Sequence, residues 1–466
     1  MASTSIYLAN GGARPINDLS LHELIGSLSF ALDMTEGQPQ GHSIRCCWIG
    51  TQIGAAIGLN GIELSDLYFT LLMKDLGCSS NAARICELYL ADDITFKRDF
   101  KTIDGSLSAA LRFVFAKTGL EAGLSDRIRA IVNIIQNGGE IAKNLIETRC
   151  HRGAEIAAKM RFSLAVQDGI RGLDEHWDGS GKPEALVGND IPLNSNIALL
   201  SQVIDIFHTE QGREGALSEI KKRSGTWFSP QLVEAFEVLQ NTPGFWNCFS
   251  NEDLDQIVFE MAPGQLSVVI DENYLDDIAS AFSDVVDAKS SFTADHSNRV
   301  TLYSDMIAEE LGLSGDHRRW LRRAALLHDI GKLAVSNQIL DKPDKLDDTE
   351  WAAIRAHPFK SECILKRVSA FSDIAPIAGS HHERLDGKGY PYGLEGDEIS
   401  LETRILTVAD VFDALTAERP YRAAMPVAQA LAILENDIGS AFDPDCVAAL
   451  QTGLRRLNAS VDVVAA

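Results

Sequence analysis

The chain has 466 residues, enough for two domains with separate cores, and its 45% hydrophobic and 23% charged residues are typical of globular proteins. Its 66 acidic residues outnumber 42 basic ones, which gives a net charge of -24. A uniformly acidic surface argues against binding duplex nucleic acid, but metals and local basic groups would still allow a small anionic substrate.

The cysteine pattern and the N-terminal sequence indicate a cytoplasmic protein. The eight cysteines, Cys46 and Cys47 among them, form no CxxC motif and no regular framework, so we expect them to be reduced. The N-terminus lacks the basic start and apolar run of a signal peptide. No stretch approaches the ~20 apolar residues that span a bilayer, so no membrane contact is expected.

Helical periodicity dominates the sequence, and alternating strand-like patterns are few. Segment 241–269, which contains Pro243 and Gly244, is expected to be a linker. After it, apolar residues from Leu275 to Val286 recur at helical spacing. Further amphipathic helices are expected, in chain order, at 299–312, 319–328, 350–368 and 402–416, with a Pro- and Gly-containing loop at 386–396. The pattern predicts an all-α fold.

The chain also repeats itself weakly. Residues 173–183 read LDEHWDGSGKP and residues 381–391 read HHERLDGKGYP, an offset of 208 that also relates Asp205 to Asp413. Repetition at a fixed offset indicates duplicated structure. We therefore expect two copies of one helical domain, at 1–240 and 270–466, the first copy carrying about 48 extra residues around 85–135.

Residues with metal-binding chemistry are concentrated in the second copy. The pair His328-Asp329 offers a nitrogen and a carboxylate side by side, which suits a carboxylate that bridges two ions. The remaining candidate ligands are His296, His357, His381, His382 and Asp410. Seven such groups suit two divalent ions such as Fe, Mn, Ni or Zn, which stabilise phosphoryl transfer and generate a bridging hydroxide near neutral pH. If the stretch is helical, Lys332, four residues after His328, shares a face with it, and its ammonium can reach a phosphate oxygen or the leaving group.

The other histidines are expected to have no metal role; they include His22, His176, His208 and His317. In the first copy the places of the seven ligands are taken by His42, Lys74, Asp75, His151, Leu173, Asp174 and Gln202. Lys74 would put a positive charge where a ligand belongs, so the first copy should hold no metal centre. We expect it to have a packing or regulatory role, with ligand binding through Lys74 and Lys182 as the alternative.

Taken together, these motifs resemble the HD-GYP family, the bacterial cyclic-dinucleotide phosphodiesterases of the HD hydrolase superfamily. The resemblance runs from His296 to Asp445 and rests on a specific set of motifs. These are His296-Ser297-Asn298-Arg299-Val300, His328-Asp329-Ile330-Gly331-Lys332, His357-Pro358, His381-His382-Glu383-Arg384, Asp386-Gly387-Lys388-Gly389-Tyr390-Pro391, Ala409-Asp410-Val411-Phe412-Asp413-Ala414-Leu415 and Arg419-Pro420-Tyr421-Arg422.

The resemblance implies two tandem HD-type helical bundles and hydrolysis of cyclic di-GMP to the linear dinucleotide, with onward cleavage to GMP left open. It implies that the seven candidates bind two divalent ions, Fe or Mn first and Ni, Mg or Zn as alternatives. Asp329 would bridge the ions and Lys332 would contact the scissile phosphate, while Tyr390, Arg419 and Arg422 would bind the substrate. Phe292 stands where some members have a glutamate, which favours two ions over three unless Asp287 or Asp295 substitutes.

Several alternatives remain open at this point. The tandem arrangement resembles a subset of the family from marine bacteria, some of which hydrolyse 3′,3′-cyclic GMP-AMP, so this substrate is the main alternative. A non-catalytic module that binds a cyclic dinucleotide, or docks a diguanylate cyclase through Gly389-Tyr390-Pro391, is a further one. An HD hydrolase of another nucleotide and a homodimer are also considered.

Overall fold

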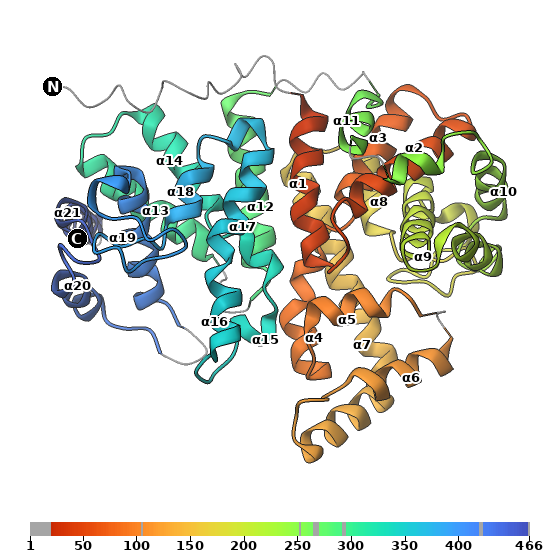
Figure 1. Ribbon diagram of the computed structural model, residues 1–466, viewed down its shortest axis with the longest axis horizontal. Helices are drawn as coiled ribbons and strands as arrows, with labels where there is room; N and C mark the ends of the chain where they lie inside the picture. Colours follow the sequence, from red (N-terminus) through yellow and green to blue (C-terminus); the bar gives the residue numbers. More distant parts are fainter. Residues whose placement is uncertain are drawn as a thin grey trace. The chain divides into compact units, whose positions relative to one another are not determined.

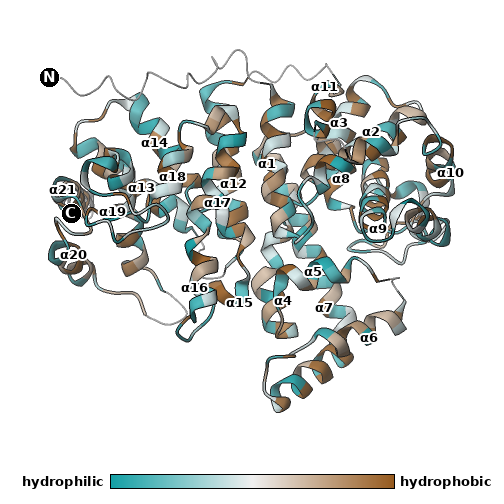
Figure 2. Cartoon of the chain, in the orientation of Figure 1, coloured by the Kyte–Doolittle hydropathy of each residue, from teal (hydrophilic) through white to brown (hydrophobic). Residues whose placement is uncertain are grey.

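The computed structural model describes residues 20–103, 106–250, 253–263, 270–290, 295–418 and 423–464 (Figure 1). These residues form α-helices and short 3-10 helices with three isolated β-bridges and no β-strand, which confirms the predicted all-α fold. None of the described helices combines the length and hydropathy needed to cross a bilayer. Most helices carry both hydrophobic and hydrophilic residues, as expected where one face packs on a core (Figure 2).

The described residues divide into two compact units. The first unit comprises residues 20–274 with 336–338, and the second comprises residues 275–335 with 339–464. The helices up to residue 260 are α1 (Leu21–Thr35), α2 (His42–Ala56), α3 (Gly61–Met73), α4 (Ala82–Tyr89), α5 (Asp93–Phe100), α6 (Leu107–Lys117), α7 (Leu124–Lys159), α8 (Leu164–Arg171), α9 (Leu193–Lys222), α10 (Pro230–Leu239) and α11 (Leu254–Glu260).

The later helices form the framework of the second unit. They are α12 (Glu272–Asp287), α13 (His296–Glu310), α14 (Gly315–Leu327), α15 (Asn337–Leu340), α16 (Asp348–Arg355), α17 (His357–Arg367), α18 (Ala375–Ser380), α19 (Leu401–Thr416), α20 (Val427–Asn436) and α21 (Pro444–Val464). In this unit α13 packs against α14, α19 and α21, and α17 packs against α18. The ends of several of these helices meet at a cluster of histidine and aspartate side chains.

The predicted helix at 350–368 is two helices in the structure. A break at Ala356 separates α16 from α17, and His357 is the first residue of α17 with Pro358 behind it. Proline is favoured in the first turn of a helix, where its missing N–H costs nothing. The apolar periodicity runs through this break, so it did not reveal that His357 begins a new helix.

Part of the predicted linker is folded onto the first unit. Helix α11 packs against α1 and α2, and Leu254 and Val258 are buried. The hydroxyl of Tyr68 donates to the carbonyl oxygen of Val258 at 3.2 Å. Segment 253–260 therefore contributes to the core of the first unit, and the division between the units falls after Tyr274.

The extra residues of the first unit build a small core of their own. They form α4, α5, α6 and the N-terminal half of α7, which together span the insertion predicted around 85–135. Their buried apolar side chains are Ile85, Leu88, Tyr89, Phe96, Phe113, Val114, Ile134 and Ile141. This cluster holds the insertion together as an independent layer.

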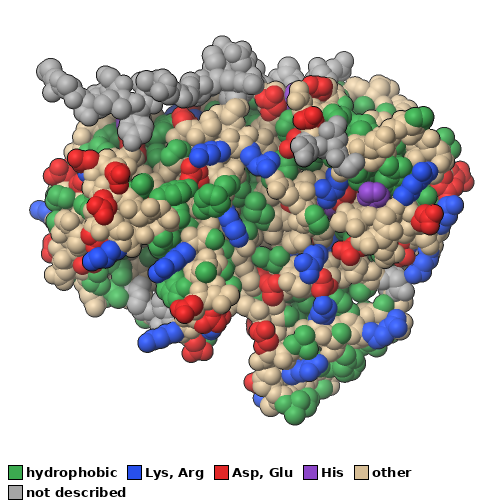
Figure 3. Space-filling view, in the orientation of Figure 1, with side chains coloured by type: hydrophobic (Ala, Val, Ile, Leu, Met, Phe, Trp, Pro, Cys, Tyr) green, Lys and Arg blue, Asp and Glu red, His purple; other side chains and the backbone are tan. Residues whose placement is uncertain are grey.

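The α6–α7 hairpin also exposes hydrophobic side chains, and Figure 3 shows hydrophobic atoms on this part of the surface. Leu107 is 76% exposed and Leu124 is 73% exposed, and Leu120, Ile128 and Phe115 are also exposed. The insertion thus has a buried layer and an outward apolar face.

A close backbone approach fixes the start of α17 in the second unit. Gly331 lies in a 3-10 helix, Ile330–Ala334, and its N–H donates to Ser361 Oγ at 2.9 Å. A Cβ atom at this position would lie 2.1 Å from the carbonyl oxygen of His357. Only glycine lets these two segments approach so closely.

We predict that Gly331→Ala destabilises the second unit by about 1–3 kcal/mol, because the added methyl must push α17 away. Thermal unfolding followed by circular dichroism measures the change. Gly315→Ala is the matched control, since a Cβ there would meet nothing within 4 Å. Equal unfolding temperatures for the two variants would contradict the prediction.

Candidate metal centre

The structure brings the seven predicted ligands of the second unit into one cluster, and most of them lie at helix ends. His296 and His357 are the first residues of α13 and α17, His328 and His381 directly follow α14 and α18, and Asp410 lies within α19. Two groups of three have all ligand atoms within 4.8 Å of one another: His296, His328 and Asp410, and His357, His381 and His382.

Local hydrogen bonds orient the imidazole rings. In His328, His357 and His381, Nδ1 lies 2.7 Å from the carbonyl oxygen three residues earlier and donates to it. In His296, Nδ1 lies 2.7 Å from Oδ2 of Asp413. Fixing Nδ1 in this way leaves Nε2 of each ring as the free ligand atom, the arrangement found at protein metal sites.

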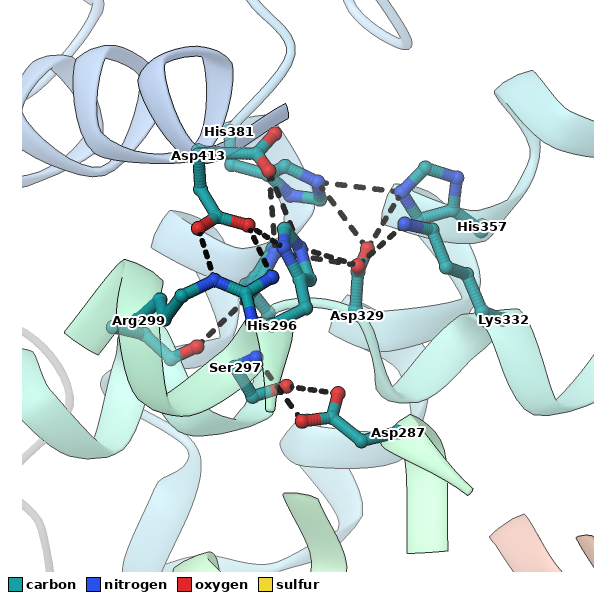
Figure 4. Close-up of polar contacts among 12 residues, drawn as sticks. Asp287, His296, Ser297, Arg299, Asp329, Lys332, His357, His381 and Asp413 are labelled. Atoms are coloured by element: carbon teal, nitrogen blue, oxygen red, sulfur yellow. Dashed lines mark hydrogen bonds and ion pairs between the residues drawn. The ribbon is translucent and has the colours of Figure 1, made fainter. Parts of the chain in front are cut away.

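Asp329 lies between the two groups of histidines (Figure 4). Its Oδ2 is 3.4 Å from Nε2 of His296 and 3.3 Å from Nε2 of His328. Its Oδ1 is 3.2 Å from Nε2 of His357 and 3.8 Å from Nε2 of His381. Each carboxylate oxygen thus faces its own pair of imidazoles, as a bridging carboxylate requires.

Unsatisfied buried atoms show that the cluster fits cations. Nε2 of His296, Nε2 of His328 and Oδ1 of Asp329 are buried and have no hydrogen-bond partner. Buried polar atoms are costly when left unpaired, so atoms of this kind that converge on one point fit the binding of a ligand. Imidazole and carboxylate donors suit divalent first-row metals, and the two groups provide places for two ions.

The protonation of the cluster agrees with cation binding. Burial lowers the pKa of His357 and of His381, which keeps both rings neutral and able to coordinate. Burial acts in the same direction on His296, but Asp329, Asp410 and Asp413 outweigh it and raise its pKa to about 10. A cation bound here would therefore displace a proton from His296.

Lys332 and Tyr390 line the edge of the cluster. His328 and Lys332 do not share an α-helix, because α14 ends at Leu327 and a 3-10 helix follows from Ile330, so the shared face expected for a helical stretch does not form. The Lys332 ammonium instead donates to Oδ2 of Asp329. The ring of Tyr390 lies 4.8 Å from the ring of His382. The predicted residues Phe292, Arg419 and Arg422 lie outside the described residues.

Asp413 lies in one of the sequence motifs and Asp287 was named as a substitute ligand, but no role in holding His296 in place was predicted for them. Asp413 accepts from Nε of Arg299 at 2.6 Å as well as from His296 (Figure 4). Asp287 accepts from the backbone N–H and the hydroxyl of Ser297, and burial raises its pKa to about 6. The sequence repeat could have revealed these roles, because the first unit contains the same two hydrogen-bonding arrangements.

The first unit keeps this supporting framework. Nδ1 of His42 lies 2.6 Å from Asp205, and Nε of Arg45 donates to the same carboxylate at 2.6 Å. Asp33 accepts from the backbone N–H and hydroxyl of Ser43, and burial raises its pKa to about 6. The two units therefore share the framework that positions the first histidine, whatever the rest of the site contains.

Ammonium groups surround the carboxylate that corresponds to Asp329. Lys74 donates to Asp75, and its Nζ lies 3.1 Å from Nε2 of His42. Nζ of Lys101, from the insertion, lies 3.9 Å from Oδ1 of Asp75 and 3.3 Å from Oε1 of Gln202. Burial alone would lower the pKa of Lys74 and Lys101, but neighbouring carboxylates reverse this and raise both. Charged lysines fill the space on both sides of Asp75.

One predicted correspondence is wrong. A Cβ on Gly77 would meet the carbonyl oxygen of Arg149, as one on Gly331 would meet that of His357. The position of His357 is therefore taken by Arg149, not by His151. A third cation thus lies at the site of the first unit, paired with Asp174.

Comparison with known proteins agrees with this geometry. Residues 115–232 and 280–446 match the HD domain family. The chain is 55% identical over 441 residues to "3'3'-cGAMP-specific phosphodiesterase 3" of Vibrio cholerae, covering 95% of this chain and 96% of that protein. The crystal structure of a cyclic GMP-AMP specific phosphodiesterase of V. cholerae, V-cGAP3, has 50% identity and a TM-score of 0.65, covering 93% and 97%. The cyclic di-GMP phosphodiesterase response regulator RpfG of Xanthomonas campestris is 41% identical over 180 residues, 38% of this chain and 48% of that protein.

We predict that Asp413→Asn weakens binding of Mn²⁺ to the full chain by about 10–100-fold, the usual effect of removing a carboxylate behind a ligating histidine. Competition against a chromophoric chelator measures the affinity. Asp305→Asn is the control, because Asp305 lies on α13, the helix of His296, but pairs with Arg318 at 2.6 Å, outside the cluster. Unchanged affinity in Asp413→Asn would show that this carboxylate does not support a ligand.

In the first unit, we predict that Lys74→Met lowers the free energy of unfolding by about 3 kcal/mol, because buried Asp75 loses its nearest cation and keeps only the more distant Lys101. The double variant Lys74→Met/Asp75→Asn should recover most of this loss, since it removes both charges. Urea unfolding followed by circular dichroism measures all three proteins. A double variant less stable than Lys74→Met would refute the pairing.

Proposed function

Because the chain belongs to the HD domain family and is a phosphodiesterase of the HD-GYP type, we propose that it hydrolyses 3′,3′-cyclic GMP-AMP to the linear dinucleotide. The observation that carries the substrate is the 55% identity to a cyclic GMP-AMP specific enzyme along 95% of the chain, including both units. The sequence alone favoured cyclic di-GMP. Similarity to RpfG, which is named for that substrate, covers only 38% of the chain.

Seven side chains would hold two divalent ions: His296, His328, Asp329, His357, His381, His382 and Asp410. Their nitrogen and oxygen donors favour Fe or Mn, with Ni, Mg and Zn as alternatives. When bound, two such ions supply positive charge to the phosphodiester and activate water for its hydrolysis. The protein's part is to fix the donors, through the Nδ1 hydrogen bonds and through Asp413.

The side chains at the edge of the cluster would bind the substrate. The Lys332 side chain is 19% exposed, so its ammonium can reach a phosphate oxygen while it still contacts Asp329. The Tyr390 ring, against His382, presents an aromatic surface on which a base can stack. Arg355, whose guanidinium lies 5.7 Å from the Tyr390 ring centre, adds a cation to this side of the site.

We expect the Mn- or Fe-loaded protein, kept anaerobic, to hydrolyse cyclic GMP-AMP with at least about tenfold higher kcat/KM than cyclic di-GMP, a difference of about 1.4 kcal/mol in transition-state binding. Chromatography of the products measures both rates. Asp329→Asn should abolish turnover of both substrates, and Asp305→Asn should leave it unchanged. Faster hydrolysis of cyclic di-GMP would overturn the substrate assignment, and inactivity toward both would overturn the proposed function.

A further inference from the structure

The first unit contains a cavity of about 340 Å³ beside the buried lysines. Helices α4, α5 and α7 of the insertion line one part of it, and α9 and the loop at 174–182 line another. This volume lies within the range of cavities that bind small organic molecules. The described part of the second unit has no counterpart of the insertion helices that line this cavity.

One zone of the cavity is apolar. Its lining includes Ile85, Phe96, Phe100, Ile146 and Val203, and further aliphatic side chains continue the same surface. Phe96 and Phe100 stack with ring centres 6.1 Å apart. A polar group placed against this surface would lose its hydrogen bonds to water without replacement. This zone therefore favours the hydrocarbon part of a ligand.

The other zone is polar, and most of its charges are already paired. Nζ of Lys101 lies 2.6 Å from Oε2 of Glu36, and Arg149 pairs with Asp174. Nζ of Lys97 lies 3.4 Å from Oδ2 of Asp93. These contacts neutralise the two acidic side chains of the lining, so neither is available to attract a cationic ligand.

Lys182 is the exception among the lining cations. It is half-buried and lines the cavity, and the described residues show no carboxylate in an ion pair with it. Its loop corresponds to the one that carries Tyr390 beside the candidate metal centre, at the offset of 208. One lining cation without an ion-pair partner, next to an apolar zone, matches a ligand with a single negative group.

We propose that this cavity is a binding site for a small amphipathic monoanion, an aliphatic or aromatic body ended by one carboxylate. The carboxylate lies at Lys182, with Arg149 beside it, and the apolar body lies between α5 and α7. A mononucleotide fits less well, because its ribose hydroxyls and base edges would face the apolar zone without partners. The site is distinct from the metal cluster and gives the first unit a ligand of its own.

Isothermal titration calorimetry of the full chain with decanoate tests the proposal. We expect one site per chain and a negative heat capacity change, the mark of apolar burial. Lys182→Ala should weaken binding at least about tenfold, since it removes a charge-assisted contact. Ala142→Phe, which places a ring in the cavity from α7, should abolish it.

Two exposed residues of α7 provide matched controls, because neither lines the cavity: Lys143→Ala for the charge and Gln136→Phe for the added ring. Both should bind decanoate as the natural chain does, and circular dichroism verifies the fold of every variant. Absence of heat with decanoate, or binding unaffected by Lys182→Ala and Ala142→Phe, would overturn the proposal. Binding of GMP or AMP in place of decanoate would overturn the ligand class. Hydrolytic activity enters none of these measurements, so they stand apart from the proposed function.

Discussion

The structure of each unit depends on one buried aspartate that joins two helices. In the second unit Asp413 of α19 accepts from His296 and Arg299 of α13, and in the first unit Asp205 of α9 accepts from His42 and Arg45 of α2. A carboxylate is stable in such a buried place only when its oxygens are paired. The pairing fixes the ring of the first histidine, and the rest of the cluster is arranged around that ring.

The two units differ in how they balance the next carboxylate. Asp329 is surrounded by imidazoles. Nε2 of His296 and Nε2 of His328 have no hydrogen-bond partner, so they are available to bind cations from solution. Asp75 is surrounded by ammonium groups of the chain itself, one at the position of a histidine and one from the insertion. The same framework can thus position either cations that exchange with solution or the ammonium groups of lysines that belong to the chain. The described groups of the second unit thus leave room for cations beside Asp329, whereas those of the first unit place fixed cations beside Asp75.

The sequence predicted the all-α fold because helical periodicity is strong along the chain. It also predicted which seven side chains converge, because their motifs are specific.

The sequence could not place the helix break at Ala356, since apolar spacing continues through it. The match of His151 to His357 failed because it paired two histidines by residue type, whereas the offset of 208 that holds after the insertion pairs His357 with Arg149. The offset between the copies is 296 − 42 = 254 before the insertion and 381 − 173 = 208 after it. A shift of two residues on α7 turns a side chain by about 200°, toward the opposite face of the helix. Lys101 has no counterpart in the second copy, so repetition could not reveal it.

The three cations of the first unit also limit how its sequence can change. Placing a histidine at position 74 alone would leave Lys101 close to Asp75 and Arg149 at the position of His357. Each cation would still repel a divalent ion, so no single substitution creates a metal site here, while each one disturbs a buried ion pair. These three positions can therefore exchange their cations for metal ligands only together, which couples the changes that the sequence of this unit can accept.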